Sequence, residues 1–306
     1  MEELVREQIH PDILKAGQIT GRVLREVAPK VRPGVSVLQL CQLVERKILE
    51  YGATGLAFPC NISVNEIAAH YTSPRNDPSV LPSRGLVKVD AGAHVNGYLA
   101  DAATTVDLDG SYESFILATQ NALSDAVELM EPGVTVGKIG AVIERAIRRE
   151  GLRSVYMLSG HEMRRWNLHA GLTIPNVASR NHDVICAGGL YAVEPFATDG
   201  FGAVRSGSGA LIFSNDLSDQ SSLDGLAREV RNMLRRRFGS LPWAPRWIRP
   251  ETRYDLNAVL GTLLSAGAVR AYPVLVEASG AMVSQFEHTV FVTEDGPIVT
   301  TALNHR

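Results

Sequence analysis

Cysteine is scarce in this sequence, which has only Cys41, Cys60 and Cys186 among its 306 residues. The three residues are far apart, odd in number, and form no Cys-x-x-Cys pair. A disulfide framework is therefore not expected. We interpret the three side chains as reduced thiols in a cytoplasmic protein.

Long apolar runs and an excess of positive charge are also missing. No stretch approaches about 18 uninterrupted apolar residues, so no membrane span is expected. Residues 1–18 are polar and amphipathic and lack the apolar core of a signal peptide. The formal net charge of -3 gives no basic footprint for nucleic acid or for an anionic membrane. What remains is the ordinary composition of a globular protein that is long enough to bury a large core.

A weak internal repeat organises the chain. The segments PGVSVLQLCQLVERKILEYG, from Pro33, and PGVTVGKIGAVIERAIRREG, from Pro132, share their opening, a Ser or Thr, a helical apolar spacing and a final Gly. The Ser or Thr is expected to cap a helix and the Gly to end it. An amphipathic helix precedes each segment, at 11–29 and 112–130. The repeat predicts two similar halves that face each other across a cleft. The alternative is a chance likeness of amphipathic helices.

Segments of strand character follow both helical units. Residues 85–108 are typical of a hairpin, with two alternating strands joined at Val95-Asn96-Gly97. In this hairpin Asp90 and Asp101 are expected to lie near each other across the strands. Further strands are expected at 155–158, 190–196, 203–213 and 281–301.

The stretch 215–270 differs from the rest of the chain. It contains a polar loop, the basic helix LAREVRNMLRRRFG and a second helix in YDLNAVLGTLLSAGAV. We expect a small helical subdomain at 215–270, inserted into a main domain formed by 1–214 and 271–306. The alternative is that these helices are integral to the main fold. The expected class is α/β (α+β).

Five potential metal ligands stand in apolar, strand-like segments that would normally exclude charge. A bare carboxylate in such a place costs several kcal/mol unless it is paired or bound to a cation. Carboxylates with one imidazole suit Mn, Fe(II), Co or Zn, and two such ions can share a bridging water. Singly, each Asp could be a cap and the His a satisfied core residue, so the hypothesis depends on all five: Asp90, Asp101, His161, Glu194 and Glu287.

Two further histidines are candidates for catalysis. His70 lies in an apolar segment before a turn, and His169 follows His161 by eight residues. An imidazole beside a metal site can bind a carbonyl oxygen or assist a leaving amine, although a structural role is an equal alternative. His288 adjoins Glu287 and is expected on the opposite face of its strand. The remaining histidines are interpreted as surface residues: His10, His94, His182 and His305.

The motifs around these residues resemble those of type II methionine aminopeptidases, particularly the short archaeal form. Five segments carry the resemblance in order: AFPCNISVNEIAAHYT, VDAGAHVNGYLADAATTV, SGHEMRRWNLHAGLTIPN, AVEPFATDGFG and SQFEHTVF. The likeness runs from about Leu14 to Thr301, and it includes the helical insertion that type I enzymes lack. It implies the pita-bread fold with internal pseudo-two-fold symmetry.

The resemblance also implies a reaction, which is removal of the initiator methionine from nascent chains whose second residue is small. Two divalent ions (Co, Mn, Fe or Zn) would be held in a dinuclear centre, with Asp101 and Glu287 bridging both. Asp90 would complete one site, and His161 with Glu194 the other. Glu194 is the implied proton acceptor. His169 would bind the scissile carbonyl, and His70 would assist at the substrate nitrogen or the intermediate.

An apolar pocket is expected to receive the methionine side chain. By position its candidate lining residues are Phe58, Leu168, Phe196, Trp243 and Tyr272, with Pro242 beside them. Core packing is the alternative for each aromatic. Cys60, next to the pocket motif, is expected to be a packed small residue and not a nucleophile. Ser73 is an extra residue relative to the His-Tyr-Thr-Pro of the family, and it is expected to alter the rim of the cleft.

Two rival functions use the same scaffold. An aminopeptidase P or prolidase shares the five ligands, but carries a separate N-terminal domain and lacks the insertion. A non-catalytic pita-bread protein that binds RNA or protein has typically lost ligands, and here Arg235-Arg236-Arg237 is most simply a solvated helix face. The expected partner is therefore the N-terminus of a nascent polypeptide, met transiently at the ribosome by a monomer. No nucleic-acid or membrane partner is expected.

Overall fold

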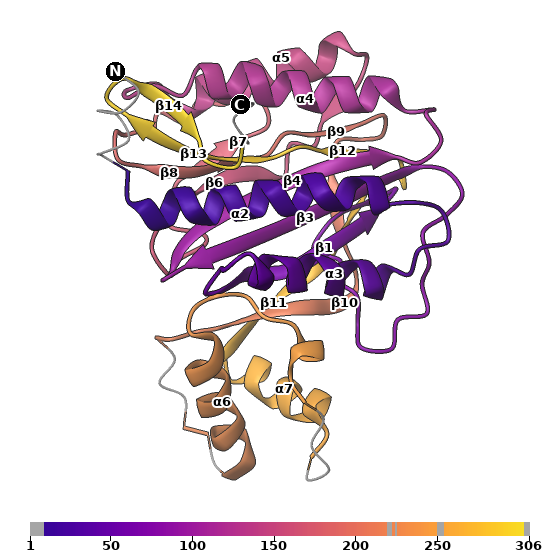
Figure 1. Cartoon of the computed structure of the whole chain (residues 1–306), viewed down its shortest axis with the longest axis vertical. Coiled ribbons are helices and arrows are strands. Elements are labelled where there is room, and N and C mark those ends of the chain that lie inside the picture. Colours follow the sequence, from indigo (N-terminus) through magenta and orange to yellow (C-terminus); the bar gives the residue numbers. More distant parts are fainter. Residues whose placement is uncertain (1–8, 219–221, 224, 250–253, 303–306) are drawn as a thin grey trace.

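Two pairs of helices cover the strands of the main body in the computed structural model, which describes residues 9–218, 222–223, 225–249 and 254–302. The first pair is α2 (Pro11–Val27) and α3 (Val37–Glu50), and the second is α4 (Glu113–Glu128) and α5 (Val136–Arg149). In Figure 1, α2 and α3 lie against β3 (Leu86–Val95) and β1 (Gly55–Val64), and α4 and α5 lie along the opposite edge of the body. The four helices predicted from the repeat and from the segments before it are confirmed.

Both repeat units begin with a turn at a glycine of positive φ, 79° at Gly34 and 85° at Gly133. The Ser36 hydroxyl then accepts the Gln39 N–H and caps α3 at a distance of 3.4 Å, as predicted. Thr135 occupies the equivalent position of α5, but its side chain makes no capping hydrogen bond. The two units are therefore alike in backbone path and differ in how the first turn is satisfied.

The strands form small sheets that meet in the middle of the molecule. The order β1-β3-β4 uses β1 (Gly55–Val64), β3 (Leu86–Val95) and β4 (Tyr98–Asp107). The order β14-β13-β8-β6-β7 uses β14 (Gly296–Val299), β13 (His288–Thr293), β8 (Leu190–Val193), β6 (Ser159–Met163) and β7 (Thr173–Pro175). A third order, β12-β9-β5, uses β12 (Val283–Gln285), β9 (Phe196–Thr198) and β5 (Arg153–Ser154).

The two halves are joined by backbone and hydroxyl hydrogen bonds between β4 and the segment 285–289. Ala103 and Glu287 exchange both backbone bonds, with N···O distances of 3.3 and 3.0 Å. The Thr289 hydroxyl donates to the Asp101 carbonyl and accepts the Asp101 N–H, both at 2.7 Å. The Thr105 hydroxyl bonds the backbone of Gln285 in the same two ways. This seam fixes the position of Glu287 relative to the β3–β4 hairpin.

Three of the predicted strands differ from the structure. The stretch 190–196 is divided into β8 and the start of β9, which belong to different sheets. Residues 155–158 are a turn between β5 and β6, because the Leu158 N–H bonds the Val155 carbonyl at 3.2 Å and the Tyr156 N–H bonds Gly202 at 2.9 Å. The apolar run there does not form a strand, since Val155 is buried and Tyr156 and Met157 are exposed. The stretch 281–301 is divided into β12, β13 and β14, since the chain leaves one sheet and joins another near Glu287.

A helical segment lies between β10 (Val204–Asn215) and β11 (Val269–Glu277). These two strands pair with each other, and β11 also pairs with β2 (Ile67–Ala69). It contains α6 (Gly225–Phe238), a 3-10 turn η2 (Pro245–Trp247) and α7 (Leu256–Ser265). Its buried side chains form a cluster of their own around Trp243, Leu234 and Leu263. In Figure 1 these helices project below β10 and β11, away from α4 and α5. The boundaries 215–270 of an inserted subdomain stay a prediction.

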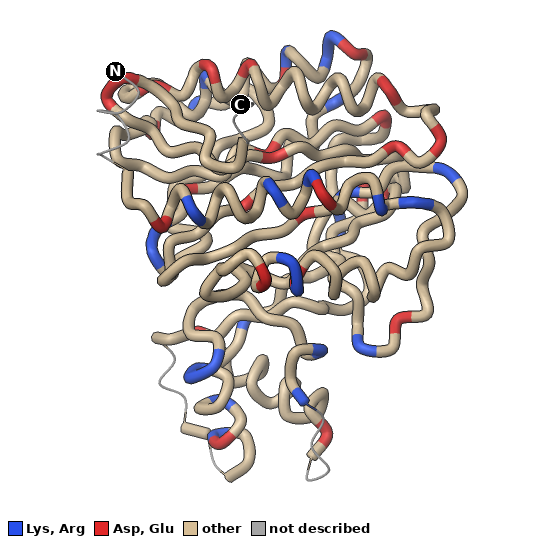
Figure 2. Tube along the Cα trace, viewed as in Figure 1, with Lys and Arg blue, Asp and Glu red and all other residues tan. Residues whose placement is uncertain are grey.

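Figure 2 shows acidic and basic residues interspersed along α2, whereas basic residues predominate on α6. Arg236 and Arg237 of that helix are exposed. The guanidinium of Arg237 donates to the Trp247 carbonyl at 2.8 Å, within the same helical segment. Among the helices of the described residues, none combines the length and apolarity that a bilayer crossing requires.

A buried ion pair ties the helical segment to the main body. Glu45 on α3 accepts hydrogen bonds from the Arg246 guanidinium, from Trp247 Nε1 at 3.0 Å and from the Cys60 N–H at 3.2 Å. Arg246 also donates to the Thr72 hydroxyl at 2.6 Å. The Glu45 and Arg246 side chains are 10% and 5% exposed, so neither charge has water as an alternative partner. The pair therefore holds the segment against the loop that follows His70.

Replacing Glu45 by Gln should lower the free energy of unfolding by about 3–5 kcal/mol, because the Arg246 charge is then buried without its counter-ion. The exposed pair Arg46–Glu50, with an N···O distance of 3.5 Å, offers a matched control on the same helix. Arg46→Ala should change the free energy by no more than about 0.5 kcal/mol. Chemical denaturation measures the unfolding free energy of both variants. Equal effects of the two substitutions would contradict the proposed contribution of the Glu45–Arg246 ion pair.

Candidate metal centre

The β3–β4 hairpin places two of the predicted ligands side by side. Asp90 pairs with Ala103, and Asp101 pairs with Gly92, so the two carboxylates are diagonal neighbours on one face of the ladder. The turn at Asn96 and Gly97 has positive φ at both residues, 50° and 86°, which is the Asn-Gly geometry that the sequence predicts. This alternation aims both aspartates into one cavity.

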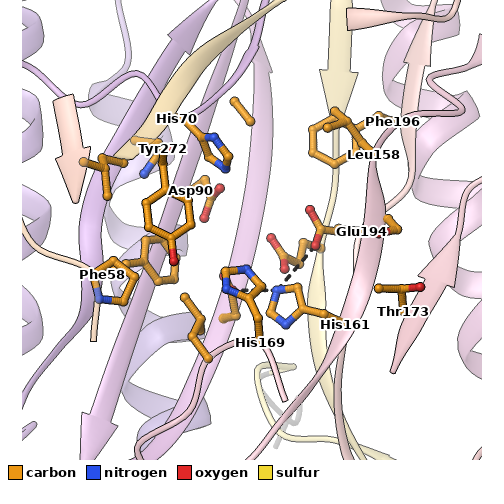
Figure 3. Close-up of a pocket in the computed structure, with 18 of the residues that line it drawn as sticks. Phe58, His70, Asp90, Leu158, His161, His169, Thr173, Glu194, Phe196 and Tyr272 are labelled. Carbon is orange, nitrogen blue, oxygen red and sulfur yellow. Dashed lines mark ion pairs between the residues drawn. The ribbon is translucent and has the colours of Figure 1, made fainter. Parts of the chain in front are cut away.

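The other three ligands come from the opposite half. His161 lies on β6 opposite Ala192 of β8, Glu194 directly follows β8, and Glu287 stands between β12 and β13. In Figure 3, Asp90 and His70 lie on one side of the cavity and His161, Glu194 and Thr173 on the other. The centre thus sits where the two halves meet, as the sequence analysis predicts.

The potential ligand atoms approach one another closely. Those of Asp101, His161 and Glu287 all lie within 4.8 Å of one another. His161 Nε2 is 3.6 Å from Asp101 Oδ2 and 3.6 Å from Glu194 Oε1. Figure 3 shows the contact between His161 and Glu194 as a dashed line. Asp90 lines the same cavity and faces Asp101 across the hairpin. Four carboxylates and one imidazole therefore converge on one place.

Burial makes this convergence costly for the protein alone. It raises the pKa of Asp101 to about 8, and it raises the pKa values of Asp90, Glu194 and Glu287 well above their ordinary range, with the neighbouring carboxylates adding to the rise in these three. A cation removes both penalties, since it replaces water as the partner of the charges.

Unsatisfied atoms test whether a metal fits. Asp90 Oδ1, Asp101 Oδ1, Glu287 Oε1 and His161 Nδ1 are buried and have no hydrogen-bond partner within the described part of the chain. Native interiors rarely leave such atoms without a partner. Three oxygens that lack donors, beside an imidazole, match the ligands that a divalent transition metal prefers. The residues present therefore fit a metal centre, and the number and identity of its ions are left to the proposal below.

The three histidines of the cavity favour the neutral form. Burial lowers the pKa of His161 to about 4. His169 is more exposed than His161, and desolvation together with the neighbouring His161 and His70 rings lowers its pKa. Burial lowers the pKa of His70 as well. The ring centroids of His161 and His169 are 4.4 Å apart, and the Tyr272 ring lies 5.7 Å from His70 and 6.1 Å from His169.

The hydrogen bond of His70 determines which ring nitrogen is free. Its Nδ1 is 3.1 Å from the Pro273 carbonyl, which can only accept. Nδ1 therefore carries the proton, and Nε2 of the neutral ring presents a lone pair. The backbone of His70 has a φ of 66°, a left-handed conformation that is unfavourable for a side chain of this size and is often found at functional sites. This conformation turns the ring into the cavity shown in Figure 3.

A cavity of about 310 Å³ contains the cluster and continues into an apolar recess. Four of the predicted pocket residues, Phe58, Leu168, Phe196 and Tyr272, line it, and so does Pro242. Trp243 does not: its side chain is fully buried and stacks between Phe213 and Phe238, at centroid distances of 5.4 and 5.5 Å. Successive side chains point in opposite directions here, so Pro242 lines the wall of the cavity and Trp243 packs in the core of the helical segment.

Other residues, which were not predicted from the sequence, also line the cavity. Asn61, Ile212 and the segments 157–159 and 171–173 contribute to its wall. The two segments flank His161 and His169 in the sequence, and this closeness to predicted site residues could have identified them. Ile212 pairs with Tyr272 across β10 and β11, a contact that only the fold reveals.

The predictions for the remaining histidines have different outcomes. His10 and His182 are exposed as predicted, and His305 lies outside the described residues. His288 points away from the centre and contacts the Thr301 hydroxyl at 2.9 Å, which confirms its expected face. The surface interpretation of His94 is wrong, because this ring is 7% exposed and packs 4.9 Å from Trp166.

The extra residue Ser73 is fully buried and does not line the cavity. Its hydroxyl donates to Asp77 Oδ2 at 2.6 Å, so it stabilises the loop that follows His70 and does not form the rim as expected. Cys60 is buried as a packed residue, and Cys41, Cys60 and Cys186 are all free thiols.

Known proteins are similar to this chain in sequence and in fold. Residues 12–294 match the model of metallopeptidase family M24. The chain is 45% identical to a protein named methionine aminopeptidase from Methanothermobacter thermautotrophicus, over 94% of this chain and 97% of that protein. Solved structures of a thermophilic Arx1 (TM-score 0.86, 18% identity, 97% of this chain and 92% of that one) and of a Thermotoga maritima methionine aminopeptidase (0.69, 21%, 96% and 98%) have the same fold. The predicted pita-bread class is confirmed.

Metal removal should destabilise the protein more at about pH 8 than at about pH 6.5. In the metal-free state the raised pKa values, about 8 for Asp101, keep protons on carboxyls that ionise near pH 4 once unfolded. Stability from these groups is present at low pH and is lost as the pH rises towards 8. The lowered pKa values of the histidines act in the opposite direction, but only below about pH 6.5, where unfolded imidazoles become protonated.

Melting temperatures of chelator-treated and Mn-loaded protein at these two pH values measure the effect. The difference between the two forms should widen with pH, because a bound cation keeps the carboxylates ionised throughout. A difference that stays constant or narrows would show that the buried carboxyls are not the groups that a metal stabilises.

Proposed function

The chain belongs to metallopeptidase family M24, and we propose that it is an aminopeptidase that releases the N-terminal methionine from nascent polypeptides whose second residue is small. The observation that carries the proposal is the convergence of Asp90, Asp101, His161, Glu194 and Glu287 in one apolar cavity. Identity of 45% over nearly the full length with a methionine aminopeptidase supports the substrate.

These five residues would hold two divalent ions of Co, Mn, Fe or Zn. Asp101 and Glu287, each with an unsatisfied buried oxygen, are the proposed bridging ligands. Asp90 would complete one site, and His161 with Glu194 the other, in keeping with the 3.6 Å contact of these two side chains. When bound, such ions acidify a water and polarise the carbonyl that it attacks.

The apolar recess accounts for the choice of methionine. Phe58, Leu168, Ile212, Pro242 and Tyr272 offer a wall without a charged anchor, which suits an unbranched thioether side chain. An acidic or basic first residue would lose its hydration in this recess without gaining a partner. The scissile carbonyl of a bound methionine then lies among the ligands and histidines that share the cavity.

His169 is the proposed donor to the carbonyl oxygen. A neutral imidazole donates one N–H, and the lowered pKa of His169 favours the neutral ring at physiological pH. His70 is positioned to accept an N–H of the substrate through Nε2, because its Nδ1–H is held by the Pro273 carbonyl. The two rings would orient the peptide bond from two sides.

Glu194 is the proposed proton carrier. Burial and the nearby carboxylates raise its pKa in the metal-free protein, but a bound cation would keep the carboxylate ionised, so that it can accept a proton. It would take the proton of the attacking water and pass it to the leaving amine. The expected partner in the cell is the N-terminus of a nascent chain, met transiently at the ribosome by a monomeric enzyme.

Proline-directed hydrolysis by an aminopeptidase P or prolidase is the alternative on this fold. The helical segment between β10 and β11 supplies Pro242 to the cavity, and such enzymes lack this insertion. A non-catalytic binding protein is the other alternative, and the retained ligands and histidines favour an enzyme.

The proposal is tested by stripping the metal and assaying the peptides Met-Ala-Ser and Ala-Pro-Ser after Mn, Co, Fe or Zn is restored. Methionine should be released from Met-Ala-Ser with at least one metal, and the Pro-containing peptide should be the poorer substrate. No methionine release with any metal would refute the proposal, and faster cleavage before proline would favour the alternative.

Two variants separate metal binding from catalysis. His169→Ala should lower kcat by about 100-fold with unchanged metal content, because a donor to the carbonyl oxygen is lost. Glu287→Ala should lose bound metal as well as activity. The exposed His182 provides a control, since His182→Ala should behave as the parent protein. Full activity of Glu287→Ala would refute the ligand assignment.

A further inference from the structure

Three large apolar side chains are exposed near the mouth of the cavity. Tyr156 is 56% exposed, Met157 54% and Phe201 68%, and Phe201 is the most exposed large apolar residue of the described chain. Single exposed apolar residues are ordinary, but several on adjoining loops beside a site mark a binding surface. We call these three residues the apolar rim.

The apolar rim is continuous with the cavity. Tyr156 and Met157 lie in the turn between β5 and β6, and Phe201 lies in the loop after β9. The Tyr156 N–H donates to the Gly202 carbonyl at 2.9 Å, which joins the two loops directly beside Phe201. Met157 also lines the cavity, next to Leu158. A chain that leaves the cavity at Met157 therefore meets the rim.

The loop that carries Phe201 is held rigidly. The fully buried carboxylate of Glu277 accepts the N–H groups of Phe201 and Gly202, at 2.7 and 3.2 Å. Its second oxygen accepts the N–H of Ser279 at 2.6 Å and of Ala281 at 3.2 Å. Four backbone donors on one carboxylate fix the backbone of an aromatic residue that packs little against its own protein. A surface ordered in advance loses less entropy on binding.

We propose that the apolar rim binds apolar side chains of the substrate polypeptide beyond its second residue. This inference rests on the proposed function. The substrate is the occupant that the geometry favours, because Met157 belongs to the wall of the cavity as well as to the rim and so offers a chain anchored by its first residue an exit along the rim. Each further residue extends the chain by about 3.3 Å, so the residues after the third can reach the loops. A partner permanently seated on the rim would cover Met157 and obstruct this exit.

The test compares two metal-loaded reactions on peptides of equal length, Met-Ala-Ser-Leu-Leu-Ser and Met-Ala-Ser-Ser-Ser-Ser. The parent protein should have a kcat/KM about fivefold higher for the Leu peptide, the gain expected from partial burial of apolar side chains. In Phe201→Ser and Tyr156→Ser the ratio should fall towards one. Turnover of Met-Ala-Ser, which is too short to reach the rim, serves as the reference in every variant.

Val80 provides the matched control, because it is 58% exposed and does not line the cavity. Val80→Ser should keep the parent ratio. A ratio of one in the parent protein, or a ratio that survives both rim substitutions, would overturn the inference. A concentration-dependent dimer that Phe201→Ser dissociates, seen by sedimentation, would also overturn it by identifying a second copy as the occupant. Absence of methionine release from every peptide would instead refute the proposed function.

Discussion

The fold is organised around one electrostatic constraint: four buried carboxylates and an imidazole that cannot share an apolar cavity without a cation. The rise in the pKa values of Asp101 and its neighbours is the expression of that cost. The Gln285 amide donates to Glu287 at 3.2 Å, but one oxygen each of Asp90, Asp101 and Glu287 has no donor within the described residues. Such a cluster of buried carboxylates is stabilised when it binds a cation, and it costs free energy when no cation is bound. The surrounding elements have the task of holding the charges close until a cation binds.

The seam between the halves performs that task. Ala103 and Glu287 exchange backbone hydrogen bonds, and the Thr289 and Thr105 hydroxyls bond across the same boundary, so ligands from both halves are fixed in one frame. The helical segment adds specificity to this frame, because Pro242, together with Ile212 and Tyr272 of the strands that lead into and out of the segment, walls the apolar recess. Its attachment through Glu45 and Arg246 also fixes the loop after His70. In the proposed function, chemistry and selectivity would come from different parts of the chain that share one cavity.

Much of this arrangement could be predicted from local sequence signals. The hairpin with Asp90 and Asp101 has strict alternation and an Asn-Gly turn, and the repeated helices have their glycines and a cap at Ser36, so short-range physics determines them. The predictions were wrong where contacts between distant segments determine the local structure or the burial of a side chain. Residues 155–158 have strand-like composition but bond across to Gly202, and Trp243 and His94 are buried by segments that are distant in sequence. These long-range contacts leave no periodic signal in the sequence. For the same reason the apolar rim at Tyr156 and Phe201 could not be predicted from the sequence.

The most direct test of the central claim is to locate the metal. A crystal of the Mn-loaded protein, measured with X-rays near the Mn absorption edge, gives an anomalous difference map that does not depend on activity. The account predicts two peaks in the cavity, both contacted by Asp101 and Glu287, with Asp90 at one and His161 and Glu194 at the other. A map without a peak among these five side chains, or with its strongest peak elsewhere on the protein, would contradict it.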